Sequence, residues 1–306
     1  MLVSVIIPTY NRIDETCKLI DSLLVSDYKD IEIIIADNNS DDGTVTAIND
    51  NYVKNGHPVV VVALERNMMA SGGRNAGIKV AKGDYYLFVD SDNVVTPNMI
   101  SELVKSFTDG VGFVAPAIIN AQTSKDVCLA GGDYNFLTSR PIRISVDETD
   151  REKVLYETCY CENAFMISKD VMQRVGGFES IYFIMYEESD LGYRIKSLGY
   201  RMYINKNAIT HHYPAMKSHF SKKLRSLGIE TPERAYHFAK NRTLFMKKFA
   251  PWYYMPTYYL FFAHLACAYY MMASIMEKRF NVALSYLKGT WKGFFMKVNK
   301  SLYIEI

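Results

Sequence analysis

Short runs of continuous apolar residues alternate with helix-like segments over the first 120 residues, and this alternation limits the possible folds most. The sequence predicts strands at 2–8, 31–36, 59–64, 85–90 and 112–119. It predicts helices between them, near 13–26, 42–54, 71–82 and 97–108. Because the apolar runs are continuous, each strand is expected to be buried on both faces, which is typical of a mostly parallel sheet between two helical layers. We therefore predict an α/β fold.

Polar side chains follow four of the predicted strands at the point where each strand ends. They are Thr9, Tyr10, Asn11 and Arg12, then Asp37, Asn38 and Asn39, then Glu65, Arg66 and Asn67, and finally Asp90 and Asp92. In a parallel sheet the carboxyl ends of the strands share one edge, and ligands bind beyond that edge. All four groups are therefore expected at one rim.

Asp90 and Asp92 lie one residue apart in GDYYLFVDSDNVVTP, directly after a strand that is expected to be buried. On an extended segment both carboxylates face the same way and repel each other, so something should compensate them. Hard divalent cations bind carboxylate oxygens and would remove the repulsion. A solvated turn before a helix that Thr96 caps is the alternative. The neighbouring polar strand ends favour a metal site.

Two further segments suit a nucleotide. Asp37 ends a strand and can accept the imide N–H of a pyrimidine base, although it could instead cap the next helix. RNMMASGGRNAGI places Arg66 and Arg74 around a small-residue turn that opens a helix, which suits a diphosphate. Arg74 could also form an ordinary surface ion pair. Neither GxGxxG nor GxxxxGK[ST] follows the first strand, which counts against a dinucleotide-binding or P-loop protein.

Acids and histidines in the second half of the chain complete the candidate residues. MYEESDL places Glu187, Glu188 and Asp190 at a helix start, where the helix dipole favours acids whatever their role. Three acids there also suit a general base that removes a proton from a hydroxyl. His211 and His212 alternate faces on a predicted strand, so only one can point into the site. That one is either structural or a ligand of the candidate metal.

The net charge of +2 conceals an uneven distribution. Residues 1–200 carry 18 Lys and Arg against 29 Asp and Glu, whereas residues 201–306 carry 17 against 4. The C-terminal third is thus a basic module, which suits anionic membranes, phosphate-bearing substrates or nucleic acid. The chain has no recognisable nucleic-acid-binding motif, so we expect no nucleic-acid partner.

Residues 249–276 contain no Asp, Glu, Lys or Arg and are numerous enough to cross a bilayer. Two prolines and six tyrosines within them are more typical of an interface, so we predict a re-entrant or surface-lying helix pair. A helical hairpin packed on the domain is the alternative. Residues 281–297 predict a second, amphipathic helix at the membrane interface.

The N-terminal segment MLVSVIIPTY has no basic region and reaches Pro8 too soon for a secretory signal. The five cysteines show no CxxC pair and no zinc spacing. We expect a cytoplasmic protein that is peripheral at the inner face of the membrane.

Four stretches together resemble the family 2 glycosyltransferases, in particular the rhamnosyltransferase-like and galactofuranosyltransferase-like members. They are VSVIIPTYNR, SGGRNAGI, VDSDN and GGFESIYFIMYEESDLGYRIKSLGY. The charge and amphipathy of the C-terminal third predict a helical, membrane-associating segment. The resemblance implies that a GT-A fold, a Rossmann-like, mostly parallel sheet with helices on both faces, precedes this segment. It implies a catalytic domain at 1–215, with a nucleotide-sugar half at 1–119 and an acceptor half at 120–215. The remaining 216–306 would form the basic, aromatic helical region.

The resemblance also implies roles for individual residues. Those implied to bind the donor are Pro8, Thr9, Tyr10, Arg12, Asp37, Asn67, Arg74, Asp90 and Ser91. The implied ligands of a divalent cation, Mn²⁺ or Mg²⁺, are Asp90, Asp92 and His212, with His211 as the runner-up. Glu188 matches the catalytic base, which is usually Asp in the family, and Glu187 and Asp190 are the neighbouring acids that could serve instead.

The function that the resemblance implies is inverting, metal-dependent transfer of a sugar from a UDP- or dTDP-sugar to a hydroxyl of a glycan or lipid-linked acceptor. One alternative is a sugar-phosphate nucleotidyltransferase, which would need a Gly-rich loop after the first strand, whereas PTYNRIDE has no glycine. Another is a non-catalytic, membrane-associated scaffold of the same fold. No particular sugar, linkage or oligomeric state is implied.

Overall fold

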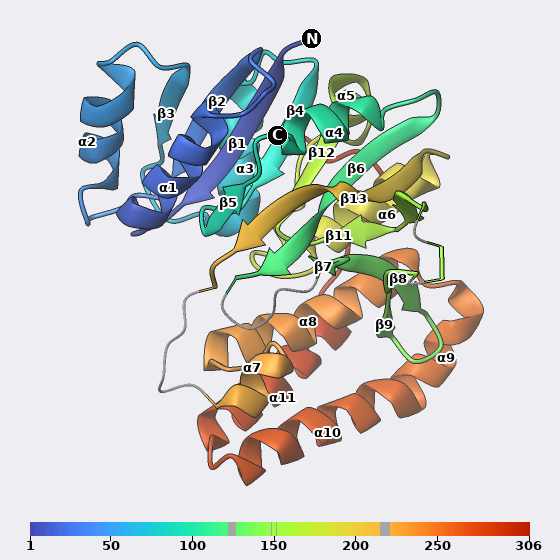
Figure 1. Cartoon of the computed structure of the whole chain (residues 1–306). Coiled ribbons are helices and arrows are strands. Elements are labelled where there is room, and N and C mark those ends of the chain that lie inside the picture. Colours follow the sequence, from blue (N-terminus) through green and yellow to red (C-terminus); the bar gives the residue numbers. More distant parts are fainter. Residues whose placement is uncertain (122–126, 148, 151, 215–220) are drawn as a thin grey trace.

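A mixed β-sheet runs through the centre of the protein (Figure 1). The computed structural model describes residues 1–121, 127–147, 149–150, 152–214 and 221–306. The main path of the sheet has the order β10-β13-β6-β12-β4-β1-β2-β3. The predicted α/β fold is therefore confirmed.

The first half of the sheet is parallel. Its strands are β1 (Val3–Thr9), β2 (Ile31–Asp37), β3 (Val59–Ala63) and β4 (Tyr85–Val89). The helices between and after them are α1 (Ile13–Leu24), α2 (Thr44–Ile48), α3 (Met69–Val80) and α4 (Met99–Lys105), and α2 continues as a π-helix over Asn49–Val53. The predicted bounds agree with these to within a few residues, except that the predicted helix at 42–54 is divided between two helix types.

The second half of the sheet is mixed. Its strands are β5 (Asn93–Val95), β6 (Val111–Asn120), β7 (Val127–Cys128), β10 (Leu155–Glu157), β12 (Ala164–Ser168) and β13 (Arg201–His212). The strand β12 lies antiparallel between β4 and β6, whereas β13 is parallel to β6. The helices α5 (Lys169–Val175) and α6 (Glu187–Ser197) separate β12 from β13. A small second sheet has the order β11-β8-β9, with β8 (Gly131–Asn135), β9 (Arg140–Arg143) and β11 (Tyr160–Cys161).

Alternate residues of the strands supply two hydrophobic cores, one on each face of the sheet. In β1, Val5 and Ile7 pack in the core that contains residues of α1, α2 and α4, whereas Ile6 packs in the core that contains residues of α3, α5 and α6. The approach of α3 to β1 requires a small residue, because a Cβ on Gly77 would lie 2.4 Å from Cγ2 of Ile6. Helices thus cover both faces of the sheet, as the continuous apolar runs predict.

The C-terminal third is helical. It contains α7 (Lys222–Ser226), α8 (Pro232–Phe249), a continuous run over Trp252–Met276 that includes α9 (Met255–Thr257) and α10 (Ala263–Met276), and α11 (Phe280–Phe295). The helices α8 and α11 cross so closely that a Cβ on Gly289 would lie 2.2 Å from the carbonyl oxygen of Tyr236. The predicted boundary between 215 and 216 lies outside the described residues.

The prediction of a helix pair within 249–276 is wrong, because Trp252–Met276 forms one uninterrupted helical run. Pro251 precedes the run and Pro256 lies in its first turns, where a proline interrupts no hydrogen bond. This run is long and apolar enough to cross a membrane, and 22% of its most apolar stretch is buried against the protein. The predicted amphipathic helix at 281–297 is confirmed as α11.

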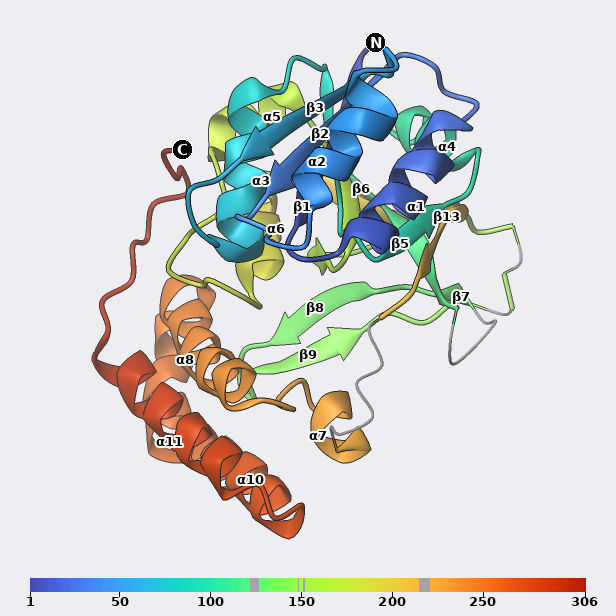
Figure 2. The same cartoon turned by 90° about the vertical axis from the view of Figure 1, so that its left-hand side faces the viewer.

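The C-terminal segment leaves α11 and returns along the protein to α5, as Figure 2 shows. Ile304 forms a β-bridge with Gly176, and its carbonyl oxygen accepts a hydrogen bond of 2.8 Å from the backbone N–H of Gly177. The last residues thereby hold the loop that connects α5 to α6.

Candidate functional site

The polar segments that follow β1, β2, β3 and β4 meet at one rim of the sheet. Asn38 connects three of them, since its backbone N–H donates to the carbonyl oxygen of Thr9 at 2.9 Å and its Oδ1 accepts from the backbone N–H of Met68 at 2.9 Å. The segment after β4 joins them through an ion pair of 2.5 Å between Nη1 of Arg12 and Oδ2 of Asp92. The expected meeting of these segments is confirmed.

Asp92 and His212 come together although 120 positions separate them in the chain. The short strand β5 pairs antiparallel with the end of β13, in a register that places Asn93 opposite His212. Oδ1 of Asp92 lies 3.6 Å from Nε2 of His212. Burial alone would raise the pKa of Asp92, but the neighbouring imidazole of His212 and the charge of Arg12 outweigh burial and hold this pKa below its usual value. His211 faces the opposite way on the strand.

A second cluster at the rim is built around the fully buried Arg74. Its Nη2 donates to Oδ1 of Asp90 at 2.8 Å, and its Nη1 donates to Oε1 of Glu188 at 2.9 Å. Oε1 of Glu187 lies 3.6 Å from the same Nη1. The rings of Phe165 and Phe178 flank the guanidinium, with their centroids 5.6 and 5.2 Å from Cζ.

The acids of this cluster outnumber its single cation. Burial, followed by the negative charge of Glu188, raises the pKa of Glu187 well above its usual range. Burial also raises the pKa of Asp90, and Arg74 offsets this increase only in part. The side chain of Glu187 is 4% exposed, whereas those of Glu188 and Asp90 are 13% and 33% exposed. Glu188 and Asp90 are therefore the members of the cluster that a ligand can reach.

The predicted contact of Arg74 with a donor diphosphate is corrected by this geometry. Both terminal nitrogens of Arg74 bond to carboxylates, and 1% of its side chain is exposed. A phosphate beyond the rim would have to displace Asp90 and Glu188 to reach the guanidinium. Arg74 therefore orients Asp90 and Glu188 instead of binding the donor.

Asp37 carries an unused acceptor at the rim. Its Oδ2 accepts the backbone N–H of Ser40 at 2.9 Å, while its buried Oδ1 has no hydrogen-bond partner among the described residues. A buried acceptor of this kind is normally paired, so it suits a donor group of a ligand. The sequence did predict an acceptor role for this residue.

The other predicted donor-binding residues differ in exposure. Tyr10 is 45% exposed, whereas Thr9 and Ser91 are buried. Oδ1 of Asn67 accepts the backbone N–H of Met69 at 2.8 Å and so shapes the turn before α3. Pro8 lies below that turn, where a Cβ on Gly73 would approach its Cβ to 3.0 Å.

Two of the three predicted metal ligands at the rim are placed to bind one divalent cation, and the third is not. Two ligands that each lie about 2.1 Å from one ion are separated by roughly 3 to 4 Å, which agrees with the distance between Asp92 and His212. Asp90, the third predicted ligand, has one oxygen on Arg74, and no group of three His, Cys, Asp or Glu side chains among the described residues could hold a metal. Asp92 and His212 therefore suit a cation that takes its remaining ligands from elsewhere.

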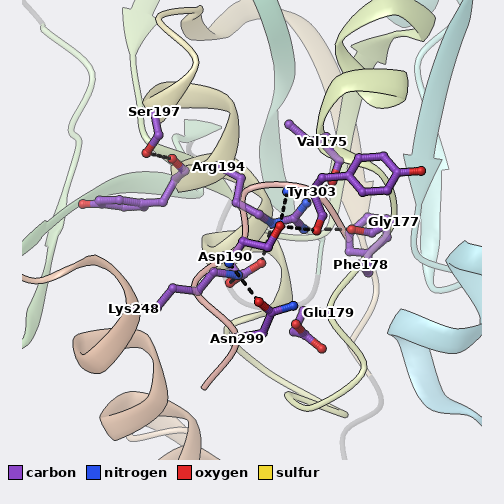
Figure 3. Close-up of polar contacts among 12 residues, drawn as sticks. Val175, Gly177, Phe178, Glu179, Asp190, Arg194, Ser197, Lys248, Asn299 and Tyr303 are labelled. Atoms are coloured by element: carbon purple, nitrogen blue, oxygen red, sulfur yellow. Dashed lines mark hydrogen bonds and ion pairs between the residues drawn. The ribbon is translucent and has the colours of Figure 1, made fainter. Parts of the chain in front are cut away.

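The structure gives Asp190 a different environment from Glu188, although two positions separate them on α6. Figure 3 shows Asp190 between Arg194 and Lys248. Its Oδ2 accepts from Nε of Arg194 at 2.7 Å, its Oδ1 accepts from Nζ of Lys248 at 2.7 Å, and all three side chains are at most 1% exposed. The prediction of Asp190 as a catalytic residue is corrected, because this carboxylate is inaccessible and holds two cations.

Sequence reasoning missed the residues that hold the approach to α6. Phe183, Met185 and Tyr186 have φ values of +64°, +65° and +72°, which non-glycine residues rarely adopt. Nδ2 of Asn241 lies within 2.8 Å of the carbonyl oxygens of Tyr182, Ile184 and Met185 and donates to them. No local pattern marks Asn241, since it lies in the middle of α8 and more than 50 positions away. The loop is strained and is positioned by α8.

The comparisons with known proteins agree with this geometry. The family description Glycosyl transferase family 2 matches residues 4–176. Glycosyltransferase GlyG of Streptococcus pneumoniae is 30% identical over 189 residues, which cover 60% of this chain and 54% of that protein. The Escherichia coli protein WfaP, a UDP-Glc:alpha-D-GlcNAc-diphosphoundecaprenol beta-1,3-glucosyltransferase, is 35% identical over 42% of this chain and 50% of its own. The chain thus spans about half the length of these relatives.

Solved structures with a similar fold support the architecture. GalNAc-T7 with UDP, GalNAc and Mn²⁺ has a TM-score of 0.68 and 18% identity, covering 84% of this chain and 50% of its own. The mannosyltransferase PcManGT of Pyrobaculum calidifontis with GDP-Man and Mn²⁺ has a TM-score of 0.57 and 15% identity, covering 96% and 87%. At these identities the likeness concerns the fold, which is GT-A.

Proposed function

The chain belongs to glycosyl transferase family 2, and from this premise we propose that it moves a sugar from a nucleoside-diphosphate sugar to an acceptor hydroxyl with inversion at the anomeric carbon. One observation supports this proposal most. Glu188, a partly exposed carboxylate, is held by Arg74 at the rim where Asp92 and His212 also lie.

The first half of the chain would bind the donor. The unpartnered Oδ1 of Asp37 accepts the imide N–H of a pyrimidine base, which favours a UDP- or dTDP-sugar. Thr9, Tyr10 and Arg12 border the same rim from the β1 side. Asp92 and His212 would hold a Mn²⁺ or Mg²⁺ ion, which neutralises charge on a leaving diphosphate when it is bound.

Glu188 would act as the general base. It accepts the proton of the acceptor hydroxyl while that oxygen attacks the anomeric carbon from the face opposite the diphosphate, and this single displacement inverts the configuration. Arg74 keeps the carboxylate in one orientation throughout. Glu187 is buried beside it with a raised pKa, so it supports the charge balance of the cluster rather than accepting the proton.

The acceptor would enter from the 120–215 half and the C-terminal helices. The exposed face of the run Trp252–Met276 carries Leu260, Phe261, Leu265 and Met272, each at least 60% exposed. Lys278, Arg279, Lys288 and Lys292 lie in and beside the following helix. Apolar side chains next to lysine and arginine favour contact with an anionic membrane and hence a lipid-linked acceptor.

Donor binding and hydrolysis test the proposal against the non-catalytic scaffold. UDP-, dTDP- and GDP-sugars are compared by thermal shift with Mn²⁺, because a ligand at 100 times its Kd stabilises the fold by about 2.7 kcal/mol. Slow hydrolysis of the bound donor with Mn²⁺, and none with a chelator, is the expected result. A protein that binds none of these donors would be a scaffold.

His211 and His212 provide a matched pair for the metal assignment. His212→Ala should remove the Mn²⁺-dependent part of donor binding, whereas His211→Ala, one residue away on the same strand, should keep it. Equal losses in the two variants would reject the assignment of Asp92 and His212 to one ion.

A further inference from the structure

A groove lies between the turn of the β8–β9 hairpin and the helices α8 and α10. Its cavity volume is about 740 Å³, which is in the range of small-molecule sites. Phe238, Phe262 and Tyr270 form an aromatic wall, and the hairpin turn that includes Ser139 forms the opposite side. Tyr186 also lines the groove, directly before the acids Glu187 and Glu188 in the chain. Tyr186 thus connects the groove to the start of α6, the helix that carries Glu188.

Arg242 provides the main charge of this groove. The residue is 7% exposed, its Nε donates to Oγ of Ser139 at 2.8 Å and its Nη2 donates to the carbonyl oxygen of Thr138 at 3.2 Å. Within the described part of the chain, no carboxylate forms an ion pair with it, and the groove lining contains no Asp or Glu. Arg140 adds a second guanidinium at the rim of the groove.

The contrast with the other buried arginines makes this environment informative. Arg74 and Arg194 are each paired with carboxylates at 2.9 Å or less. A guanidinium is seldom buried without an anion, because its desolvation is then uncompensated. The groove thus offers a buried cation to an anion that comes from outside the protein.

The outer part of the groove is apolar. Leu265 and Tyr269 of α10 line it and are 63% and 50% exposed, on the same helical run whose face we assign to the membrane. A ligand with its anionic group at Arg242 can extend along these side chains toward lipid. The groove is therefore cationic at Arg242 and apolar at its outer part, which matches the two halves of an amphiphile.

We propose that this groove binds the diphosphate of an isoprenoid-type lipid acceptor, with Arg242 paired to the diphosphate and with Leu265 and Tyr269 against the hydrocarbon chain. The proposal rests on the proposed glycosyltransferase function and names the acceptor class of the same site. The sugar attached to the diphosphate then lies on the Tyr186 side, toward Glu188.

Geranyl diphosphate is a soluble probe for this site. Inorganic diphosphate carries only its charged half, and geraniol carries only its hydrocarbon half. Binding to the full chain is measured calorimetrically with a chelator present, so that diphosphate binding at the metal-dependent donor site is suppressed. Geranyl diphosphate should bind about tenfold or more tightly than either half, since loss of one charged hydrogen bond costs about that factor. Equal binding of geranyl diphosphate and inorganic diphosphate would reject a lipid diphosphate.

Two variants and a matched control locate the binding. Arg242→Gln should weaken geranyl diphosphate binding about tenfold. Leu265→Glu should also weaken it, and since that side chain is exposed the fold is retained even if Arg242→Gln is unstable. Leu284→Glu, an equivalent change at a 51% exposed position of α11, should leave it unchanged. Wild-type affinity in Leu265→Glu and in folded Arg242→Gln would overturn the proposal and leave a phosphate-free glycan as the occupant.

Donor hydrolysis separates this proposal from the proposed function. The wild-type chain is assayed for donor hydrolysis in the absence of acceptor, in parallel with its binding of geranyl diphosphate. If the wild-type chain hydrolyses no donor but binds geranyl diphosphate at Arg242, the catalytic proposal fails and the groove assignment stands.

Discussion

Two clusters of arginine and carboxylate lie around the first turn of α6, and they differ in access to solvent. In the rim cluster, Arg74 holds Glu188 and Asp90, whose side chains are 13% and 33% exposed. In the closed cluster, Arg194 and Lys248 hold Asp190, and no side chain is more than 1% exposed. Glu188 and Asp190 are two positions apart on the helix, so they point in directions about 200° apart.

The balance of charge differs as well. The rim cluster has three acids around one arginine, and the pKa values of Glu187 and Asp90 are raised by burial and by their neighbouring acids. The closed cluster has two cations around one acid. Excess negative charge that remains accessible suits proton transfer and cation binding, whereas a sealed and fully paired acid suits stability. We therefore propose that accessibility, rather than residue type, separates the catalytic acid from the structural one.

The largest expected effect is on catalysis by the rim cluster. Glu188→Gln should lower the rate of transfer by a factor of about 10² to 10⁴, because the amide cannot accept the hydroxyl proton. The unfolding temperature should stay near the wild-type value, since Arg74 keeps its bond to Asp90. The initial rate of nucleoside-diphosphate release measures the effect. Near-wild-type turnover would move the base to Glu187.

The matched change in the closed cluster should affect stability instead. Asp190→Asn removes the only carboxylate between Arg194 and Lys248 and should lower the free energy of unfolding by about 3 to 5 kcal/mol. The fraction that remains folded should keep its rate of transfer. Urea unfolding and activity assays on Glu188→Gln and Asp190→Asn measure both effects. A loss of activity without a loss of stability in Asp190→Asn would contradict the structural role of Asp190.

A smaller effect is expected where α8 holds the loop between the two clusters. Asn241→Ala removes a donor that serves three carbonyl oxygens and should lower the free energy of unfolding by about 1 to 3 kcal/mol. The rate should also fall, because this strained loop sets the direction of Glu188. Asn55→Ala, which removes an exposed amide that bonds to Asn51, is the control and should change stability by about 0.5 kcal/mol or less. Equal effects of the two changes would contradict the role of Asn241.

The smallest expected effect is a pH dependence at His237, a half-buried group on α8. Burial, and then the charge of Lys240, lower the pKa of His237 to about 4. The unfolded chain therefore binds a proton at higher pH than the folded protein, so His237 contributes stability above about pH 6.5 that is lost as the pH falls toward 4. After allowance for solvent this amounts to about 1 kcal/mol, or about 2 °C in Tm.

The measurement compares Tm between pH 6.5 and 4.5 in the wild type and in His237→Gln. The variant should lose less stability over this interval, since it has no group to protonate there. An identical pH dependence in both proteins would show that His237 is accessible enough to titrate normally.

The strands and helices could be predicted because their signals are local. Continuous apolar runs such as Tyr85–Val89 remain buried in nearly any packing, so the strands, and the meeting of their polar ends at one rim, followed from the sequence. The approach of His212 to Asp92 came from resemblance to a family, since a separation of 120 positions leaves no local pattern. The prediction for 249–276 was wrong because Pro256 lies in the first turns of the run Trp252–Met276, where a proline does not end a helix.

The roles of the buried charges could not be predicted from their neighbours in the chain. Arg74 suits a diphosphate by its sequence context, and only the tertiary structure, which brings the end of β4 and the start of α6 to α3, gives it carboxylate partners. Asp190 has a local partner in Arg194, four positions on in α6, but Lys248 of α8, which completes its pairing, has no local signal. Such assignments depend on which distant helix covers a side chain, and that is a property of the tertiary structure.

The close crossing of α8 and α11 has a consequence for the membrane contact that we propose. Lys248, Asn241 and Arg242 of α8 contact α6, the loop before it and the β8–β9 turn, and Gly289 and Gly293 allow α11 to lie directly against α8. The C-terminal helices therefore cannot separate from α8 to insert alone without dismantling the supports of α6. Adsorption would proceed as a rigid body, and the angle at which the apolar face rests on the bilayer would set the height of Glu188 above the headgroups.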